Sequence, residues 1–220
     1  TRAVAYDRSG LGRSAPDPAG PTLTRMADDL NDLLDQLDKD ERGGSYVLVG
    51  HSDGGPIVRL AASRRPERIA GLVLVDPTDE AADVMFAPWF RRVQRAFIDG
   101  GSLLAHARLL RFLSRARVQA APPDVRRDLL AEAFTPQVMA TWREHARTLL
   151  DDMAAWRLDP PQLGDIPVTV ISASQPANGV GRAIRESVNA AHAYRATQSP
   201  HGRHVVAENS GHDIPGTDPR

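Results

Sequence analysis

Tyr46-Val47-Leu48-Val49-Gly50-His51-Ser52-Asp53-Gly54-Gly55 is the stretch around which the rest of the chain can be ordered. A short run of β-forming residues ends in Gly-x-Ser-x-Gly, and the apolar residues 56–62 that follow predict a buried helix. A serine at the tip of a tight strand-to-helix turn occupies strained backbone, so the residues two places away must be small. The first N–H groups of the helix point towards negative charge that develops near the serine. The stretch therefore predicts a nucleophilic Ser52, and the alternative is a glycine-rich turn with an incidental serine.

Length and composition limit the possible classes of protein. The chain has 220 residues, enough for one α/β domain or two small ones, and a net charge of −1. A charge near zero argues against a nucleic-acid or anionic-membrane partner. The absence of cysteine excludes disulfides, thiolate catalysis and cysteine-ligated metals. No apolar stretch approaches the roughly 20 residues that span a bilayer. The oligomeric state and the compartment stay open, with the cytoplasm as the default.

Strand and helix patterns alternate at short spacing on both sides of this stretch. Strands are predicted at residues 2–6, 46–50, 69–75, 167–171 and 203–207, and helices from Thr22 or Thr24 to about 40, after Ser52 to about 64, and over 181–197. Such alternation implies right-handed crossovers and a mostly parallel central sheet flanked by helices. We therefore predict an α/β fold, with a core formed by residues 1–78 and 162–220.

Residues 79–161 have a different pattern, which predicts an inserted helical cap or lid. Strand-like runs disappear, and amphipathic helices lie between breaks expected at Gly100-Gly101, Pro122-Pro123 and Pro136. Every Phe and Trp of the chain lies in this insertion. Four apolar side chains that follow Asp76 closely are candidates for a substrate pocket, namely Met85, Phe86, Trp89 and Phe90. The alternative is that these side chains form the core that small helices need.

A serine nucleophile needs a base to remove its proton and a carboxylate to orient that base. His212 lies in a loop just past the last predicted strand, at the sheet edge where parallel sheets place their sites. We expect the side chain of His51, the neighbour of Ser52, to point away from it at so sharp a turn. The other histidines fall in predicted helices or beside the last strand. His212 is therefore the predicted base, and the alternative is a loop histidine that packs locally.

Asp76 is the predicted carboxylate. It ends the strand that follows the nucleophile's strand, and no acid follows the next predicted strand until Glu186. Asp79, Glu80 and Asp213 are expected to be surface or capping residues. Asp53 is expected to contribute its backbone N–H to an oxyanion hole rather than its side chain.

Four motifs together resemble the α/β-hydrolase family: Gly50-His51-Ser52-Asp53-Gly54-Gly55, residues 6–14 (YDRSGLGRS), residues 72–77 (LVLVDP) and Ser210-Gly211-His212-Asp213. The order serine, acid, histidine along the chain is also that of the family. In many members the acid follows the strand that here ends at Ile171, and in a subset it follows one strand earlier, as Asp76 does. Relatives with an aspartate nucleophile, the haloalkane dehalogenases and epoxide hydrolases, are disfavoured because Ser52 holds that position.

The resemblance also predicts an incomplete N-terminal part. Residues 6–8 are similar to the family's fourth strand and its loop, so three opening strands are expected to be absent. With them goes the His-Gly loop that supplies the second oxyanion-hole N–H in the family. The strand at 46–50 is then expected to have an exposed apolar edge, and the chain is interpreted as a fragment of a longer hydrolase.

The resemblance implies a serine hydrolase that cleaves a carboxylic ester or related acyl compound. The expected partner is a small apolar acyl substrate, and no metal, organic cofactor, nucleic acid or membrane span is expected. One alternative is a ligand-binding or receptor protein that turns substrate over slowly or not at all. A C–C hydrolase or a cofactor-free perhydrolase is a further alternative, because each uses the same three residues.

Overall fold

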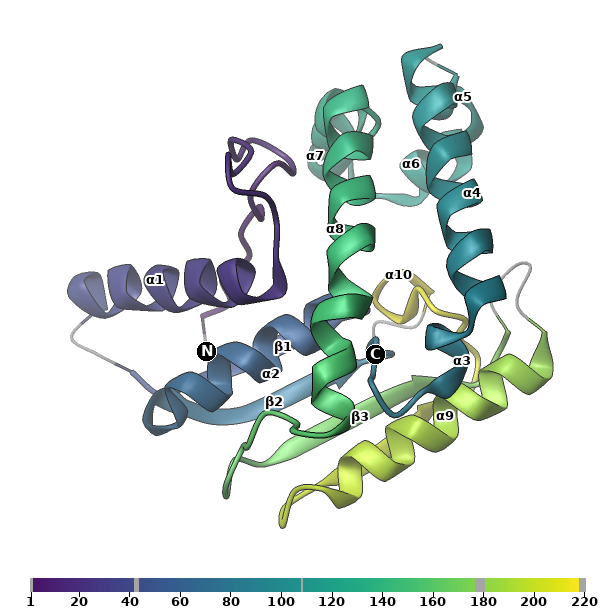
Figure 1. Cartoon of the computed structure of the whole chain (residues 1–220). Coiled ribbons are helices and arrows are strands. Elements are labelled where there is room, and N and C mark those ends of the chain that lie inside the picture. Colours follow the sequence, from purple (N-terminus) through teal and green to yellow (C-terminus); the bar gives the residue numbers. More distant parts are fainter. Residues whose placement is uncertain (1, 42–43, 108, 177–180, 218–220) are drawn as a thin grey trace. The chain divides into compact units, whose positions relative to one another are not determined.

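The computed structural model describes residues 2–41, 44–107, 109–176 and 181–217. The chain forms two compact units (Figure 1). One, the sheet unit, comprises Leu23–Ala87 and Asp151–Arg220, and the other, the helical unit, comprises Thr1–Thr22 and Pro88–Leu150. The first 22 residues thus group with helices rather than with the sheet. The division into a core and a cap at residues 79–161 stays a prediction.

The sheet unit is built on four parallel strands in the order β1-β2-β3-β4. The strands are β1 (Tyr46–His51), β2 (Ile69–Val75), β3 (Val168–Ala173) and β4 (Arg203–Ala207). The helices of this unit are α1 (Leu23–Glu41), α2 (Gly54–Arg64), η1 (Pro66–Arg68), α3 (Asp83–Phe86), η3 (Ala155–Arg157), α9 (Arg182–Thr197) and α10 (Ile214–Thr217). The predicted parallel α/β architecture is confirmed.

One face of the sheet is well buried and the other is more open at β1. Leu48 of β1, Leu72 of β2 and Val168 of β3 are neighbours in register and are all buried. Val47 and Val49 point to the other face because side chains alternate along a strand, and they are 58% and 63% exposed. β1 also forms an edge of the sheet.

Helices α2 and α9 pack on the sheet, and α1 packs on α2. α2 contacts β1 and β2, and α9 contacts β3 and β4. α1 buries the apolar stripe that its sequence predicts, with Met26, Leu30 and Leu34 among its least exposed side chains. The order strand, helix, strand therefore brings the C-terminal ends of β1, β2, β3 and β4 to one edge of the sheet, where a site is expected.

The helical unit contains α4 (Pro88–His106), α5 (Leu110–Leu113), α6 (Arg115–Ala120), α7 (Pro123–Asp128), a short π-helical turn (Leu129–Ala133) and most of α8 (Pro136–Ala154). Helices begin at Pro123 and Pro136 as predicted, but α4 continues through Gly100-Gly101. The predicted break is wrong, because glycine inside a helix costs only about 1 kcal/mol relative to alanine and does not by itself end the helix. None of the described helices is both long and apolar enough to cross a bilayer.

The predicted strand at residues 2–6 is also wrong. Residues 2–7 have no regular secondary structure, and Val4 and Tyr6 are exposed. An isolated extended segment gains no ladder hydrogen bonds, and these residues belong to the helical unit, which has no strand among its described residues. A β-forming composition is therefore insufficient at this position.

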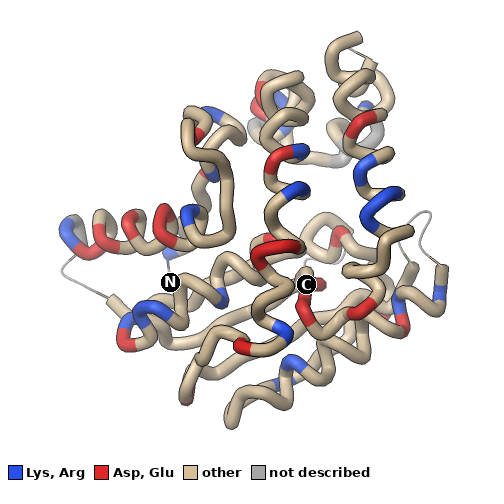
Figure 2. Tube along the Cα trace, in the orientation of Figure 1, with Lys and Arg blue, Asp and Glu red and all other residues tan. Residues whose placement is uncertain are grey.

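Charges of opposite sign lie on different helices. Figure 2 shows mainly acidic residues along α1 and mainly basic residues along α4. Over the whole chain, 27 basic and 28 acidic residues nearly cancel, so the net charge is only −1. The predicted absence of a nucleic-acid partner stays a prediction.

Candidate active site

Ser52 lies in a tight turn between β1 and α2, as its motif predicts. Its φ angle is +54°, a left-handed conformation that a residue with a side chain rarely adopts. Three backbone hydrogen bonds hold this turn. The N–H of Ser52 donates to the carbonyl of Val75 (3.0 Å), and the carbonyl of Ser52 accepts from the N–H groups of Gly55 (2.9 Å) and Thr78 (3.0 Å). The end of β2 therefore fixes the backbone that carries the hydroxyl.

The close packing of this turn requires glycine at positions 50 and 55. A Cβ at Gly50 would lie 2.4 Å from the carbonyl oxygen of Gly54, and a Cβ at Gly55 would lie 2.5 Å from the Cβ of Pro77. A Cβ at Gly54 would meet no atom within 4 Å. The sequence predicts that both residues two places from Ser52, Gly50 and Gly54, must be small. The contacts require this of Gly50 but not of Gly54.

Replacing Gly50 by alanine is expected to lower the free energy of unfolding by about 2 kcal/mol, because the new methyl group overlaps backbone that cannot move freely. Gly54→Ala is the matched control, with an expected change below about 1 kcal/mol. Urea denaturation of both variants measures the difference. Equal losses in the two variants would contradict the packing argument.

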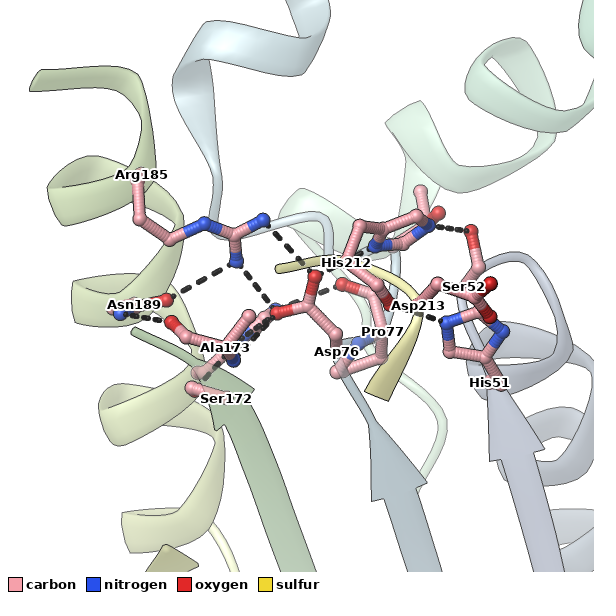
Figure 3. Close-up of polar contacts among 12 residues, drawn as sticks. His51, Ser52, Asp76, Pro77, Ser172, Ala173, Arg185, Asn189, His212 and Asp213 are labelled. Carbon is pink, nitrogen blue, oxygen red and sulfur yellow. Dashed lines mark hydrogen bonds and ion pairs between the residues drawn. The ribbon is translucent and has the colours of Figure 1, made fainter. Parts of the chain in front are cut away.

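Asp76 follows β2 and is almost fully buried, with 2% of its side chain exposed. Its φ angle is +40°, a second left-handed position at the same edge of the sheet. Its carboxylate accepts hydrogen bonds from Nδ1 of His212 (2.6 Å), from the guanidinium of Arg185 (2.6 and 3.0 Å) and from the N–H of Ala173 (3.1 Å), as Figure 3 shows. Burial alone would raise the pKa of Asp76, but the hydrogen bonds from His212 and Arg185 and the charge of Arg185 outweigh it and hold that pKa well below its usual range. The carboxylate is therefore ionised.

His212 lies in the loop after β4 and joins the other two residues (Figure 3). Its Nε2 is 2.9 Å from Oγ of Ser52, and its Nδ1 is 2.6 Å from Oδ2 of Asp76. An ionised carboxylate can only accept, so Nδ1 carries the proton and Nε2 is left to accept the proton of Ser52. The imidazole is 44% exposed, which leaves it accessible from solvent. The structure thus brings together the serine, the histidine and the aspartate that the sequence singles out.

His51 makes a contact that the sequence did not suggest, while its predicted orientation away from the hydroxyl of Ser52 stays a prediction. Its Nε2 donates to the backbone carbonyl of His212 (2.7 Å), and the two imidazole rings lie 4.8 Å apart between centroids. The side chain reaches across the edge of the sheet to the loop that carries His212. Sequence reasoning missed this role because a contact between residues 161 positions apart has no local signal.

Asp53 occupies the N-cap position of α2 without a side-chain capping hydrogen bond, and its carboxylate accepts a hydrogen bond from Oγ1 of Thr78 (2.6 Å). The side chain is thus engaged away from Ser52, which agrees with the expectation that only its backbone N–H is available. The use of this N–H in an oxyanion hole stays a prediction.

The four candidate pocket residues are divided between the two units. Met85 and Phe86 lie on α3 in the sheet unit, where Met85 packs against a cluster of Ala82, Val188 and Ala191 and Phe86 lies 4.9 Å from the guanidinium carbon of Arg157. Trp89 and Phe90 are on α4 in the helical unit and contact each other edge to face at 5.8 Å. Each thus has a packing partner within its own unit, and the predicted pocket stays a prediction.

Asp79 and Glu80 are not surface residues, which corrects the expectation from sequence. They are 0% and 3% exposed and pair with two equally hidden arginines, Arg59 of α2 and Arg195 of α9. Burial of the two carboxylates is possible because two cations from different helices meet them. The sequence carried no signal for this pairing, since the partners lie 21 and 116 residues away.

A family model described as "Alpha/beta hydrolase family" matches residues 1–220. The chain belongs to this family. Among curated relatives, the chain is 40% identical over 74 residues to lipase LipV of Mycobacterium tuberculosis, and 40% identical over 75 residues to a non-heme chloroperoxidase of Streptomyces lividans. Each match covers 34% of this chain and 26% of the relative, so the aligned part is about a quarter of those proteins' length.

The fold of the chain is similar to that of a thermophilic esterase from Thermogutta terrifontis, with a TM-score of 0.63 and 22% identity. A second solved structure, an alpha/beta hydrolase named ALR0039 from Nostoc sp. PCC 7120, has a TM-score of 0.70 and 20% identity. The matches cover 97% of this chain and 73% and 76% of those chains. At this identity the similarity concerns the fold alone.

Proposed function

We propose that this hydrolase cleaves a carboxylic ester or a related acyl compound with Ser52 as nucleophile, His212 as base and Asp76 as the orienting acid. The proposal rests on the continuous chain of contacts from Oγ of Ser52 through both ring nitrogens of His212 to an ionised Asp76. Nucleophile, base and orienting group in hydrogen-bond contact are the arrangement that activates a serine. The lipase among the curated relatives agrees with this reaction class.

In the proposed reaction Nε2 of His212 takes the proton of Ser52 as Oγ attacks the acyl carbon. Asp76 keeps the imidazole in the required tautomer and stabilises the imidazolium that forms. The N–H of Asp53 stabilises the oxyanion at the start of α2. The imidazolium then protonates the leaving alcohol, and a water deprotonated by His212 releases the acid and regenerates Ser52. The substrate is expected to be small and apolar in its acyl part.

A fluorophosphonate probe tests the nucleophile directly. The probe is expected to form a covalent adduct at Oγ of Ser52, and mass spectrometry of the peptide containing residues 46–59 locates it. The Ser52→Ala variant, with its fold checked by circular dichroism, is expected to remain unlabelled. Equal labelling of the two proteins, or an adduct on another residue, would overturn the assignment.

A perhydrolase reaction is the second candidate, because a non-heme chloroperoxidase is among the similar proteins. In that reaction hydrogen peroxide replaces water as the acceptor of the acyl group, and a peracid is released. Steady turnover of a p-nitrophenyl ester in peroxide-free buffer favours the hydrolase. Acceleration that depends on peroxide, with the oxidation of an added halide, favours the second candidate.

A further inference from the structure

One face of α9 carries polar side chains that form hydrogen bonds with Asp76 and with the backbone beside it at the edge of the sheet. Arg185, Asn189 and His192 lie at positions i, i+4 and i+7 and therefore share this face. The amide of Asn189 donates to the carbonyl of Ala173 (2.9 Å), and Nε2 of His192 donates to the carbonyl of Pro77 (2.8 Å). Both bonds fix backbone next to Asp76, whereas Arg185 contacts the carboxylate itself (Figure 3).

Arg185 makes a buried, two-pronged ion pair with Asp76. Nη1 donates to Oδ1 at 2.6 Å and Nη2 donates to Oδ2 at 3.0 Å, and the arginine is only 6% exposed. Orientation of Asp76 alone would not require a charge, because the N–H of Ala173 already holds Oδ1. Burial of a guanidinium is costly unless its charge is used in a pair. Hydrogen bonding to Asp76 is therefore one feature of Arg185, and the effect of its positive charge on the site is a separate question.

We propose, given the function proposed above, that Arg185 is a positioning residue whose charge sets how readily His212 takes up a proton. An unpaired Asp76 would stabilise the imidazolium with a full negative charge. The guanidinium neutralises much of that charge and also repels the imidazolium directly, so both effects make proton uptake by His212 less favourable.

The other titratable groups around this pair do not supply the same charge. They are His51 of β1, Asp53 before α2, His192 of α9 and Asp213 of the loop that carries His212. Nδ1 of His192 lies 3.8 Å from Oδ1 of Asp76, but burial lowers the pKa of His192, and its contacts fit the neutral ring. Its Nε2 donates to a carbonyl and its Nδ1 accepts from the hydroxyl of Ser172 (2.8 Å). Among the described residues, Arg185 is thus the permanent cation hydrogen-bonded to Asp76.

The test follows the titration of His212 by NMR in the 220-residue chain, labelled at its histidines, with the His212 signal assigned from His212→Gln. Removing the charge in Arg185→Met is expected to move the midpoint of the titration up by about one pH unit, corresponding to unit charges a few ångströms apart in a partly screened site. Arg185→Gln also removes the charge but keeps hydrogen-bond donors. It is expected to move the midpoint by the same amount as Arg185→Met, and it is the variant to use if Arg185→Met is the less well folded of the two. Arg185→Lys keeps the charge and is expected to return the midpoint most of the way.

Arg195→Met is the matched control, because it removes another buried arginine from the same helix that pairs with Asp79 and Glu80 instead of Asp76. It is expected to lower the melting temperature without moving the His212 midpoint. An unchanged midpoint in both neutral variants at 185, or equal shifts at 185 and 195, would overturn the proposal.

The NMR measurement needs no turnover, so it is separate from the test of the proposed function. If the probe labels Ser52 but the midpoint is unchanged, only the role of Arg185 fails. If the midpoint shifts and no probe or ester reacts, the proposed function fails while the electrostatic coupling stands. In an active protein, the acidic limb of kcat/KM is expected to shift with the midpoint in Arg185→Met, whereas a merely structural role would lower kcat at every pH.

Discussion

Asp76→Asn is expected to lower kcat by about 10⁴-fold. The amide can present an N–H to Nδ1 of His212 where the carboxylate only accepts, which favours the tautomer with its proton on Nε2. Nε2 could then no longer take the proton of Ser52, with which it is in contact at 2.9 Å. The backbone at this position, with φ of +40°, is accessible to asparagine, which tolerates left-handed conformations. Initial rates with a p-nitrophenyl ester measure the loss.

Two controls separate chemistry from folding in this experiment. Glu186→Gln changes the rival acid, which is exposed on α9, and is expected to leave kcat within a few-fold of the parent. Asp79→Asn disturbs a buried carboxylate that also pairs with an arginine of α9 but does not contact His212. It is expected to cost stability and to retain turnover at temperatures where the variant is folded. If Glu186→Gln were the more damaging of the two acid substitutions, Asp76 would not be the orienting acid.

The second large effect concerns stability. Arg59→Met is expected to lower the free energy of unfolding by about 3–5 kcal/mol, because it leaves Asp79 and Glu80 buried with a single arginine. Nη1 and Nη2 of Arg59 contact Glu80 at 2.6 and 2.7 Å, and its guanidinium lies 5.2 Å from the ring centre of Trp156. The sheet unit contains all five residues of this cluster, namely Arg59, Asp79, Glu80, Trp156 and Arg195. Chemical denaturation measures the change.

Arg64→Met is the control from the same helix. Arg64 pairs with Asp28 at the surface, where both side chains are partly exposed, so the expected loss is below about 1 kcal/mol. In a double substitution, Glu80→Gln is expected to recover part of the loss caused by Arg59→Met, since it removes one of the two carboxylates that Arg195 would then have to neutralise alone. Similar losses for the two arginines would show that burial does not decide the energy of these pairs.

The buried ion pairs of Asp79 also predict how the free energy of unfolding depends on pH. Burial alone would raise the pKa of Asp79, but the hydrogen bond from Arg195 and the charges of Arg59 and Arg195 lower it below its ordinary value of 3.8. The folded state therefore binds fewer protons than the unfolded state below about pH 4. The contribution of Asp79 is complete above the unfolded-state pKa and is lost as pH falls towards the folded-state value. The slope of stability against pH in this range is expected to flatten in Asp79→Asn.

Much of the sheet unit could be predicted because the determining signals are local. Gly50 and Ser52 in their motif are sufficient to predict a strand, a strained turn and a helix, and apolar runs predict the strands that follow. Asp76 and His212 were identifiable because Asp76 directly follows one strand and His212 lies in the loop after another, and the ends of parallel strands meet at one edge. Residues 2–6 show the limit of such signals, because a strand also requires a neighbour with which to pair.

The sequence by itself determined which hydroxyl, imidazole and carboxylate meet at the edge of the sheet, since strand order and strand ends place them. Only the tertiary structure decided what surrounds them: Arg185 on the carboxylate, His51 on the loop of His212, and the arginines that neutralise Asp79 and Glu80. Such contacts join residues far apart in the chain, and any of several similar side chains on a helix could have made them. Burial selects among these candidates, because a charge removed from water is stable only where a partner of opposite charge is within reach.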